Sequence, residues 1–438
     1  MKIIHDLVIN HTSDKHQWFV ESQKSKTNSY RHWYIWRPPK YNAAGQPFPP
    51  NNWASIWGGS AWEFSEQTGE YYLHLFSPQQ PDLNFNCQAA VDAIKKMMRF
   101  WLDKGINGFR LDAINFISKD TYLRDAEVTD TTSIYQQAFD RFNHGPRVHE
   151  ILQEFYADVL SVGEAAFTSP QQAVQYVRQD RRDKELQMIF HTEHVDLYGG
   201  FEVITGMYSE AEVLTPGMQE GPPEPRDYVK LAEHDSWQSA FLSNHDQPRP
   251  INNILQADFA HRNEAAKLLC LFLCTQAGTL FIYQGEEIGM MNVPPDWPIH
   301  EYKDLVTQKY WQEQIARAGD VAGEPAASLS HVIAAINRKA RDNARTPMPW
   351  NRMPKAGFTA STPWMRINED NRYCNVADQQ DRPNSIWTFW RDTLHLRKST
   401  AALIYGTFEL CLRPEQPQLI AYQRELEGEI WVFIANFD

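Results

Sequence analysis

The stretch Gly105-Ile106-Asn107-Gly108-Phe109-Arg110-Leu111-Asp112 decides the fold of this 438-residue chain. Residues 90–104, just before it, carry apolar side chains at helical spacing (Val91, Ile94, Met97, Met98, Trp101, Leu102). The two glycines end this helix, and the apolar segment after them predicts a strand with Arg110 and Asp112 at its C-terminal end. Charged groups at the carboxyl ends of parallel barrel strands are typically catalytic. Taken alone, an Arg-x-Asp pair is better explained by a solvated turn, so the other strand ends must decide.

Similar strand ends recur along the chain. A buried strand over residues 2–9 ends in Asn10-His11, a strand over 161–164 ends in Glu164, and one over 240–243 precedes Asn244-His245-Asp246. Further strands are expected over 186–190 and 279–283, and helices over 148–160, 171–178 and 260–274. Six alternations of strand and helix predict a parallel sheet, and right-handed crossovers make a closed barrel the simplest arrangement.

Two segments differ in character from the barrel. Residues 12–85 are rich in Trp, Tyr, Pro and Asn and show strand-like alternation over 70–76, which predicts an inserted β-rich domain. Its tryptophans fit a core or a sugar-binding surface equally well. The prolines of 211–227 indicate a loop, and a β-rich tail starts near residue 403. We therefore predict a barrel of residues 1–11 and 86–402, an insertion of 12–85 and a C-terminal β-domain of 403–438.

The composition and net charge of the chain limit the kinds of molecule that it can bind. A net charge of −13 without a long basic run argues against nucleic acid, and the high aromatic content of 13% suits flat, partly apolar ligands such as sugars. The five cysteines are odd in number and lack metal-ligand spacing, so we expect a reducing, cytoplasmic location. We find neither a signal peptide nor a membrane span in the sequence, and we expect a monomer.

The three carboxylates Asp112, Glu164 and Asp246 predict a chemistry. A retaining glycosidase uses two carboxyl groups about 5–5.5 Å apart, one as the nucleophile that attacks the anomeric carbon and one as the acid and then the base. Arg110 beside the nucleophile would keep it ionised. A third carboxylate can hold the sugar hydroxyls as positive charge develops on the ring.

Four motifs resemble those of the α-amylase superfamily, in the usual order: residues 6–11 (DLVINH), 108–112 (GFRLD), 162–164 (VGE) and 244–246 (NHD). Three more resemble its oligo-1,6-glucosidase/α-glucosidase branch: residues 80–84 (QPDLN), 284–290 (QGEEIGM) and 344–348 (ARTPM). Seven motifs in order make the resemblance specific, and it covers essentially the whole chain.

The resemblance implies a role for each matching residue. Asp112 matches the nucleophile, Glu164 the general acid/base and Asp246 the transition-state carboxylate. The implied substrate-binding residues are His11, His245, Arg110, Arg345 and Arg249. No metal or cofactor is implied. A metal site at His5, Asp6 and His11 is disfavoured, because neighbouring residues of a strand point to opposite faces. Glu286 and Glu287 fit a helix cap and are not assigned to catalysis.

Ala113, directly after the nucleophile, indicates the linkage. In this family a Val there accompanies α-1,6 linkages and a smaller residue or Thr accompanies α-1,4, so we predict a maltase-like α-1,4-glucosidase acting on small oligosaccharides. The alternatives on the same scaffold are an isomaltase, a trehalose-6-phosphate hydrolase or a transglucosylase. The non-enzymatic alternatives are an inactive fragment or an interaction module like the heavy chains of amino-acid transporters, which typically lose the catalytic carboxylates and carry a membrane span.

The resemblance also predicts an incomplete barrel. The expected fold is a (β/α)8 TIM barrel that lacks its first two βα units, with a β-rich insertion after the third strand and a shortened C-terminal β-domain. Such a chain would expose barrel-strand edges, so we expect poor folding and little activity from it as written.

Overall fold

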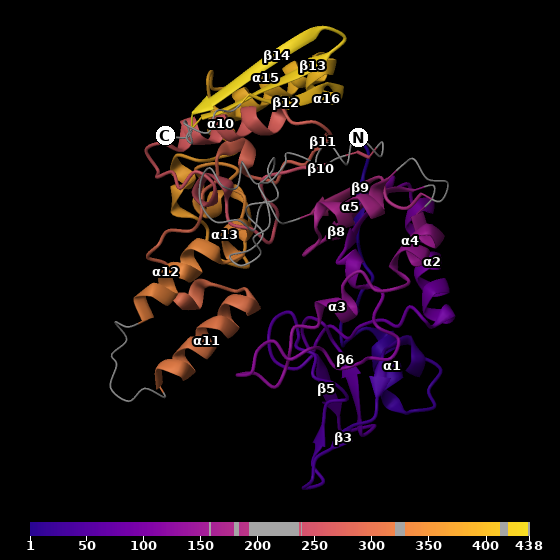
Figure 1. Cartoon of the computed structure of the whole chain (residues 1–438). Coiled ribbons are helices and arrows are strands. Elements are labelled where there is room, and N and C mark those ends of the chain that lie inside the picture. Colours follow the sequence, from indigo (N-terminus) through magenta and orange to yellow (C-terminus); the bar gives the residue numbers. More distant parts are fainter. Residues whose placement is uncertain are drawn as a thin grey trace. The chain divides into compact units, whose positions relative to one another are not determined.

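The computed structural model describes residues 1–156, 159–178, 184–191, 236–237, 239–319, 329–411 and 419–436 (Figure 1). The predicted loop at 211–227 lies outside these residues. The chain divides into two compact units, Met1–Thr192 with Lys230–Trp237, and Glu193–Val229 with Gln238–Asp438. Each unit is described by itself.

The first unit is built on four parallel strands in the order β1-β7-β8-β9. These are β1 (Ile4–Val8), β7 (Gly108–Asp112), β8 (Leu160–Ala165) and β9 (Met188–His191). Helices α2 (Gln88–Asp103), α4 (Val148–Tyr156) and α5 (Pro170–Val177) precede β7, β8 and β9 in the chain, as strand–helix alternation predicts (Figure 1).

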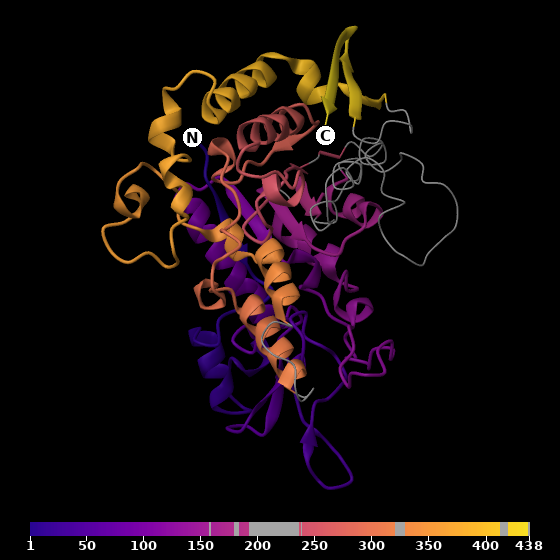
Figure 2. The ribbon, with the colours of Figure 1, turned by 90° about the vertical axis from the view of Figure 1, so that its left-hand side faces the viewer.

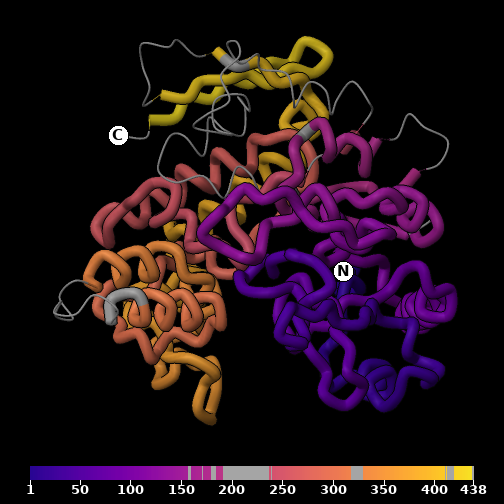
Figure 3. The backbone as a smooth tube through the Cα atoms, turned by 60° about the horizontal axis from the view of Figure 1, so that its bottom comes forward, coloured from indigo at the N-terminus to yellow at the C-terminus, as the bar shows by residue number. Residues whose placement is uncertain are grey.

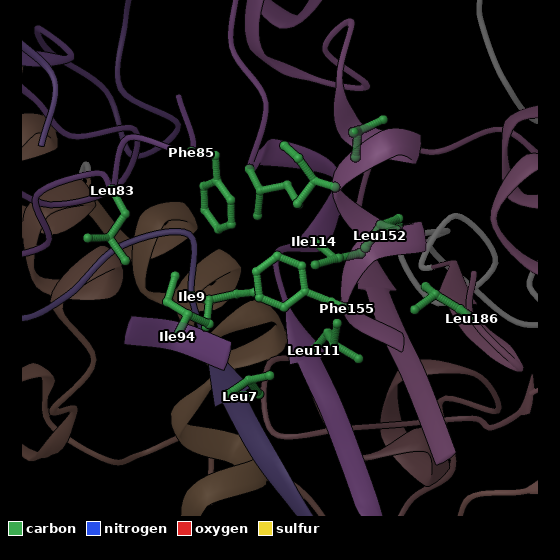
Figure 4. Packing of buried hydrophobic residues seen from close by; sticks show 14 of the residues in the cluster. Leu7, Ile9, Leu83, Phe85, Ile94, Leu111, Ile114, Leu152, Phe155 and Leu186 are labelled. Carbon is green, nitrogen blue, oxygen red and sulfur yellow. The ribbon is translucent and has the colours of Figure 1, made fainter. Parts of the chain in front are cut away.

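Side chains alternate along the strands, so the sheet has two faces of different character. Leu7, Ile9 and Leu111 are buried and pack in one cluster with Ile94 of α2 and Leu152 of α4 (Figure 4). Because successive residues of a strand point to opposite faces, the residues between them lie on the other side of the sheet. The apolar positions of the central strands therefore bind the helices, and the charged positions are left for the opposite face.

Two glycines shape the stretch that decides the fold. Gly105 has φ +98°, a left-handed conformation that ends α2 and that other residues rarely adopt. Gly108 pairs with Leu160 of β8, and a Cβ atom on it would lie 2.0 Å from the Leu160 carbonyl oxygen. A larger residue at 108 would push β7 and β8 apart, so glycine is required for this register.

The insertion contains two small antiparallel sheets, β2-β6-β5 and β3-β4. Its elements are α1 (Gln17–Lys24), β2 (Trp36–Arg37), β3 (Lys40–Tyr41), β4 (Pro47–Phe48), β5 (Trp62–Ser65) and β6 (Glu70–Leu73). Trp36, Trp53 and Trp62 are buried, and the indole N–H of Trp62 donates to Asn51 Oδ1 at 2.7 Å. Of the two roles predicted for the tryptophans, these three have the core role.

The second unit contains a two-stranded parallel sheet of β10 (Ser239–Ala240) and β11 (Thr279–Leu280). Helices α10 (Arg262–Cys274) and α15 (Ile386–Ser399) pack side by side near it (Figure 2). The strands predicted over 240–243 and 279–283 are therefore too long. The ladder ends early because the chain after β10 turns, with the Asp246 amide bonded to Asn244 Oδ1 at 2.8 Å.

Other helices and a C-terminal sheet complete the described part of this unit. The helices are α9 (Pro250–Asn253), α11 (Leu305–Gly319), α12 (Ser330–Lys339), α13 (Asp342–Arg345), α14 (Val376–Gln380) and α16 (Ala401–Tyr405); a short α3 (Phe139–Phe142) belongs to the first unit. Antiparallel β12 (Thr407–Leu410), β13 (Leu419–Leu426) and β14 (Glu429–Asn436) form the sheet (Figure 3). No helix among the described residues has the length and apolarity needed to cross a bilayer.

Candidate active site

The strand register brings three predicted residues of the first unit to one face of the sheet. Arg110 of β7 pairs with Asp6 of β1 on one side and with Val162 of β8 on the other. Residues two apart on a strand share a face, so Asp112 and Glu164 follow on that face, one step nearer the carboxyl ends of β7 and β8. Their side chains contact a common group, the Arg110 guanidinium.

Arg110 binds the carboxylates of three residues. Its Nη1 lies 2.8 Å from Asp6 Oδ1 and 2.6 Å from Asp112 Oδ1, and its Nη2 lies 2.6 Å from Glu164 Oε2. Burial by itself lowers the pKa of Arg110, but Glu164, Asp112 and Asp6 outweigh it and raise the pKa above its ordinary value. The guanidinium is therefore a fixed cation that holds the two predicted catalytic carboxyl groups on neighbouring strands at one point.

Three carboxyl groups share this one guanidinium. The Asp6 side chain is half-exposed, whereas those of Asp112 and Glu164 are more buried.

The turn after the predicted nucleophile is tight. Ala113 has φ 47° and ψ 41°, the left-handed conformation, and its amide nitrogen lies 3.4 Å from Glu164 Oε2. The residue is buried, at 7% exposure. Its small side chain lies at the end of β7, where a β-branched residue would meet backbone strain as well as less space.

A buried polar network supports the end of β1, and sequence reasoning missed its centre, Lys119. The Lys119 ammonium lies 2.7 Å from Asp82 Oδ1 and 2.8 Å from Asn10 Oδ1. Asn10 Nδ2 also donates to Asp82 Oδ1 at 3.0 Å, and Asp82 Oδ2 accepts from the amide of Leu75 at 2.7 Å. These contacts join β1, the motif at 80–84 and the segment after β7. The motif marked Asp82 in the sequence, but nothing local marked the lysine.

His11, predicted to bind substrate, lies against this network. Its Nδ1 is 3.3 Å from Asn10 Nδ2, and its Nε2 is 2.9 Å from the side-chain amide of Gln80. Burial lowers the pKa of His11, which Asp82 and Asp112 only partly oppose. Burial therefore favours the neutral imidazole, whose two ring nitrogens are held between the side-chain amides of Asn10 and Gln80.

In the second unit, Asp246 accepts from two arginines. Arg341 Nη1 and Arg345 Nη2 lie 3.0 and 2.5 Å from its Oδ1, and His245 Nε2 lies 3.5 Å from its Oδ2. Burial raises the pKa of Asp246, but these three side chains outweigh it and hold the pKa below its ordinary value. Sequence reasoning found Arg345 and missed Arg341, which also binds the buried Asp304 at 2.6 Å.

Arg249 has a different environment from the one expected of a substrate-binding residue. It is 1% exposed, and its guanidinium donates to the carbonyls of Gln284 at 2.7 Å and Ala344 at 3.2 Å. Its bonds tie the segment after β11 to α13. This environment favours a structural role, because two of its guanidinium nitrogens donate to backbone carbonyls in the protein interior.

Comparison with known proteins shows the family to which the chain belongs. Residues 1–406 match the family model described as alpha amylase, catalytic domain. The chain belongs to the α-amylase family. Two relatives in this family are each 41% identical over the whole chain and 75% of their own length: an alpha-glucosidase of Schizosaccharomyces pombe and an oligo-1,6-glucosidase of Parageobacillus thermoglucosidasius.

Solved structures agree with this placement in the α-amylase family. Trehalose-6-phosphate hydrolase of Bacillus licheniformis matches with TM-score 0.80 and 34% identity, and an isomaltulose synthase mutant of Erwinia rhapontici with TM-score 0.83 and 32% identity. Each match covers 100% of this chain and 75% of the other. The barrel class predicted from strand–helix alternation is confirmed, and the chain is an α-amylase-family enzyme by its relatives.

Proposed function

We propose that this protein is a retaining α-glucosidase that releases terminal α-1,4-linked glucose from maltose-like oligosaccharides by double displacement. The observation that carries the proposal is the pair of carboxyl groups on β7 and β8, Asp112 and Glu164, bound to one guanidinium. In the first step Asp112 attacks the anomeric carbon while Glu164 protonates the departing oxygen. In the second step Glu164 removes a proton from water, which displaces the Asp112 ester and restores the starting state.

Four further residues are proposed to act on the glucosyl ring. Asp246 holds ring hydroxyls as oxocarbenium charge develops, and Arg345 keeps that carboxylate ionised and aligned. His11 and His245 bind hydroxyls through imidazole nitrogens. We leave Arg249 out of the substrate-binding set because its guanidinium is committed to the interior.

The linkage preference rests on Ala113. A methyl side chain leaves more space beside the scissile bond than Val would, which favours α-1,4 over α-1,6 linkages by a modest factor. The names of the relatives, alpha-glucosidase and oligo-1,6-glucosidase, cover both linkages, and the structural neighbours add trehalose-6-phosphate hydrolysis and isomaltulose synthesis as competing activities. We also propose that the insertion of residues 12–85 and the tail from residue 403 are separate domains. We propose further that the protein is a monomer and acts in a reducing, cytoplasmic compartment, where its five free cysteines are stable.

Product analysis by proton NMR tests the proposal. Hydrolysis of maltose by the purified protein, which the incomplete barrel is expected to make slow, should release α-glucose before β-glucose, with slower release still from isomaltose and trehalose 6-phosphate. Release of β-glucose first would contradict double displacement, and faster isomaltose cleavage would contradict the linkage assignment.

Variants separate the two carboxyl groups. Asp112→Asn is expected to abolish turnover. Glu164→Ala is expected to be rescued by azide, which needs no base and displaces the β-linked Asp112 ester with inversion to yield a glucosyl azide of α configuration. Asp140→Asn, an exposed acidic position of the same unit, is the matched control and should keep full activity. Turnover by Asp112→Asn at the rate of this control would refute the role of Asp112.

A further inference from the structure

A second site candidate lies in the second unit, and none of the residues that line it is proposed for catalysis. A cavity of about 450 Å³ opens at the start of α10 and α15 and is lined by residues of both helices and of the segment between Arg352 and Ser385. Its volume falls in the range of small-molecule sites. None of its lining residues belongs to the seven family motifs, so the catalytic proposal does not account for it.

The charge of the lining is opposite to the charge of the chain. Five cations border the cavity, against the two acidic residues Glu264 and Asp378: Arg262, Lys267, Arg352, Arg372 and Arg382. The whole chain has net charge −13, with 42 basic and 55 acidic residues. A chance selection from this composition would be acidic, so the basic lining needs a local reason.

Internal pairing accounts for only two of the five cations. Arg262 pairs with Asp370, and Arg352 pairs with Asp378. Lys267 donates one N–H to the carbonyl of Asn384 at 2.7 Å and keeps two donors.

The two remaining cations are arginines of the exposed rim. In the described part of the chain, neither an ion pair nor a hydrogen bond engages the guanidinium of Arg372 or Arg382, although the charge of Arg382 helps to lower the pKa of Asp378. Three cations therefore face Glu264 as the single uncompensated acid of the lining. Such an excess matches a phosphate dianion better than a carboxylate, and arginine's planar fork suits phosphate oxygens.

An aromatic pair borders the same cavity. Phe259 and Tyr373 are 53% and 71% exposed, and their rings meet edge to face at 5.6 Å. Exposed aromatic faces beside cations can pack against the body of an organic phosphate. A polyanion such as nucleic acid is disfavoured by the repulsion of the acidic chain and by the limited volume of the cavity.

We propose that this cavity binds a small phosphate-bearing molecule, with its phosphate between Lys267, Arg372 and Arg382 and its organic body against Phe259 and Tyr373. Glucose 6-phosphate is the probe, and phosphorus NMR line broadening reports its binding to the whole protein. The Arg372→Ala/Arg382→Ala double variant is expected to weaken binding at least about tenfold, since each charge-assisted bond to phosphate is strong. Both arginines are exposed, so the variant should fold.

Three controls keep the test specific. Arg391→Ala removes an exposed arginine of α15 that does not line the cavity, and it should leave binding unchanged. Maltose, which the proposed active site would bind, should not compete with the phosphate probe, which separates this cavity from that site. Glucose without phosphate should not compete. Unchanged binding by the double variant, an equal loss in Arg391→Ala, or absence of binding to the unaltered protein would overturn the proposal.

Discussion

Replacing Glu286 by glutamine is expected to change how stability depends on pH. Glu286 begins the short helix after Gly285 and is buried, at 7% exposure. One carboxyl oxygen accepts from the Ser243 hydroxyl, and the other has no hydrogen-bond partner among the described residues. A carboxylate in that position is poorly solvated, whereas a protonated carboxyl or an amide is tolerated.

The expected change in the free energy of unfolding follows from the raised pKa of Glu286. Burial raises the pKa of Glu286 from 4.5 to about 7, although Ser243 and Arg249 oppose the rise. Each pKa unit corresponds to about 1.4 kcal/mol, so charging this group costs the folded state about 3 kcal/mol more than the unfolded state. The folded state binds the extra proton between pH 4.5 and about 7, and stability falls as pH rises through that interval.

Urea unfolding, followed by tryptophan fluorescence at a series of pH values, tests this reasoning. Relative to the unaltered protein, Glu286→Gln should gain about 3 kcal/mol in the free energy of unfolding between acidic and mildly alkaline pH, because glutamine does not ionise. Ser243→Ala removes the donor that lowers the pKa of Glu286, so the pH-dependent loss should move to higher pH. A stability difference that is constant with pH, or that shrinks as pH rises, would refute the buried-acid explanation.

Three other substitutions probe the polar networks. Lys119→Met leaves the Asp82 carboxylate buried without its cation and should lower the free energy of unfolding in urea by about 3–5 kcal/mol. The Lys119→Met/Asp82→Asn double variant should recover part of this loss. If it recovers none, the pairing of Lys119 with Asp82 is contradicted. Arg341→Met removes one of the cations that lower the pKa of Asp246, so this pKa should rise. As the pH falls, the stability provided by the ionised Asp246 should then be lost at a higher pH than in the unaltered protein. Thermal unfolding at a series of acidic pH values measures this difference. Ala113→Val should lower stability by about 1 kcal/mol through left-handed backbone strain and shift the maltose-to-isomaltose rate ratio toward isomaltose; an unchanged ratio would remove the linkage argument.

Local sequence patterns predicted the strand-end residues correctly wherever a strand was long. The predicted strand 2–9 appears as Ile4–Val8 and the helix before the opening glycine as Gln88–Asp103. The prediction that this strand is buried was wrong for Ile4 and Val8, which are 37% and 45% exposed on the face opposite Leu7. Strands β10 and β11 have two residues each, and their apolar flanks looked like longer strands. Hydrophobicity indicates burial there, but the hydrogen-bond ladder depends on where the chain turns, which side-chain bonds decide.

Contacts between residues that are far apart in the chain could not be predicted from the sequence. Lys119 and Asp82 are 37 positions apart, and a buried lysine is exceptional enough that composition argues against it. The same limit affected Arg249, whose motif position suggested a sugar contact while its partners, two backbone carbonyls far along the chain, carry no sequence signal.

Strand register explains how a single arginine contacts the two carboxyl groups for which we propose different catalytic roles. Because Arg110 is level with Asp6 on β1 and Val162 on β8, its guanidinium reaches toward the strand ends, where Asp112 and Glu164 follow two residues later. A lysine at 110 would offer a point charge in place of a fork and could not hold both carboxylates at fixed separation. The separation of the two carboxyl groups determines retention or inversion. The geometry of the guanidinium, more than its charge, is therefore what this site requires from residue 110.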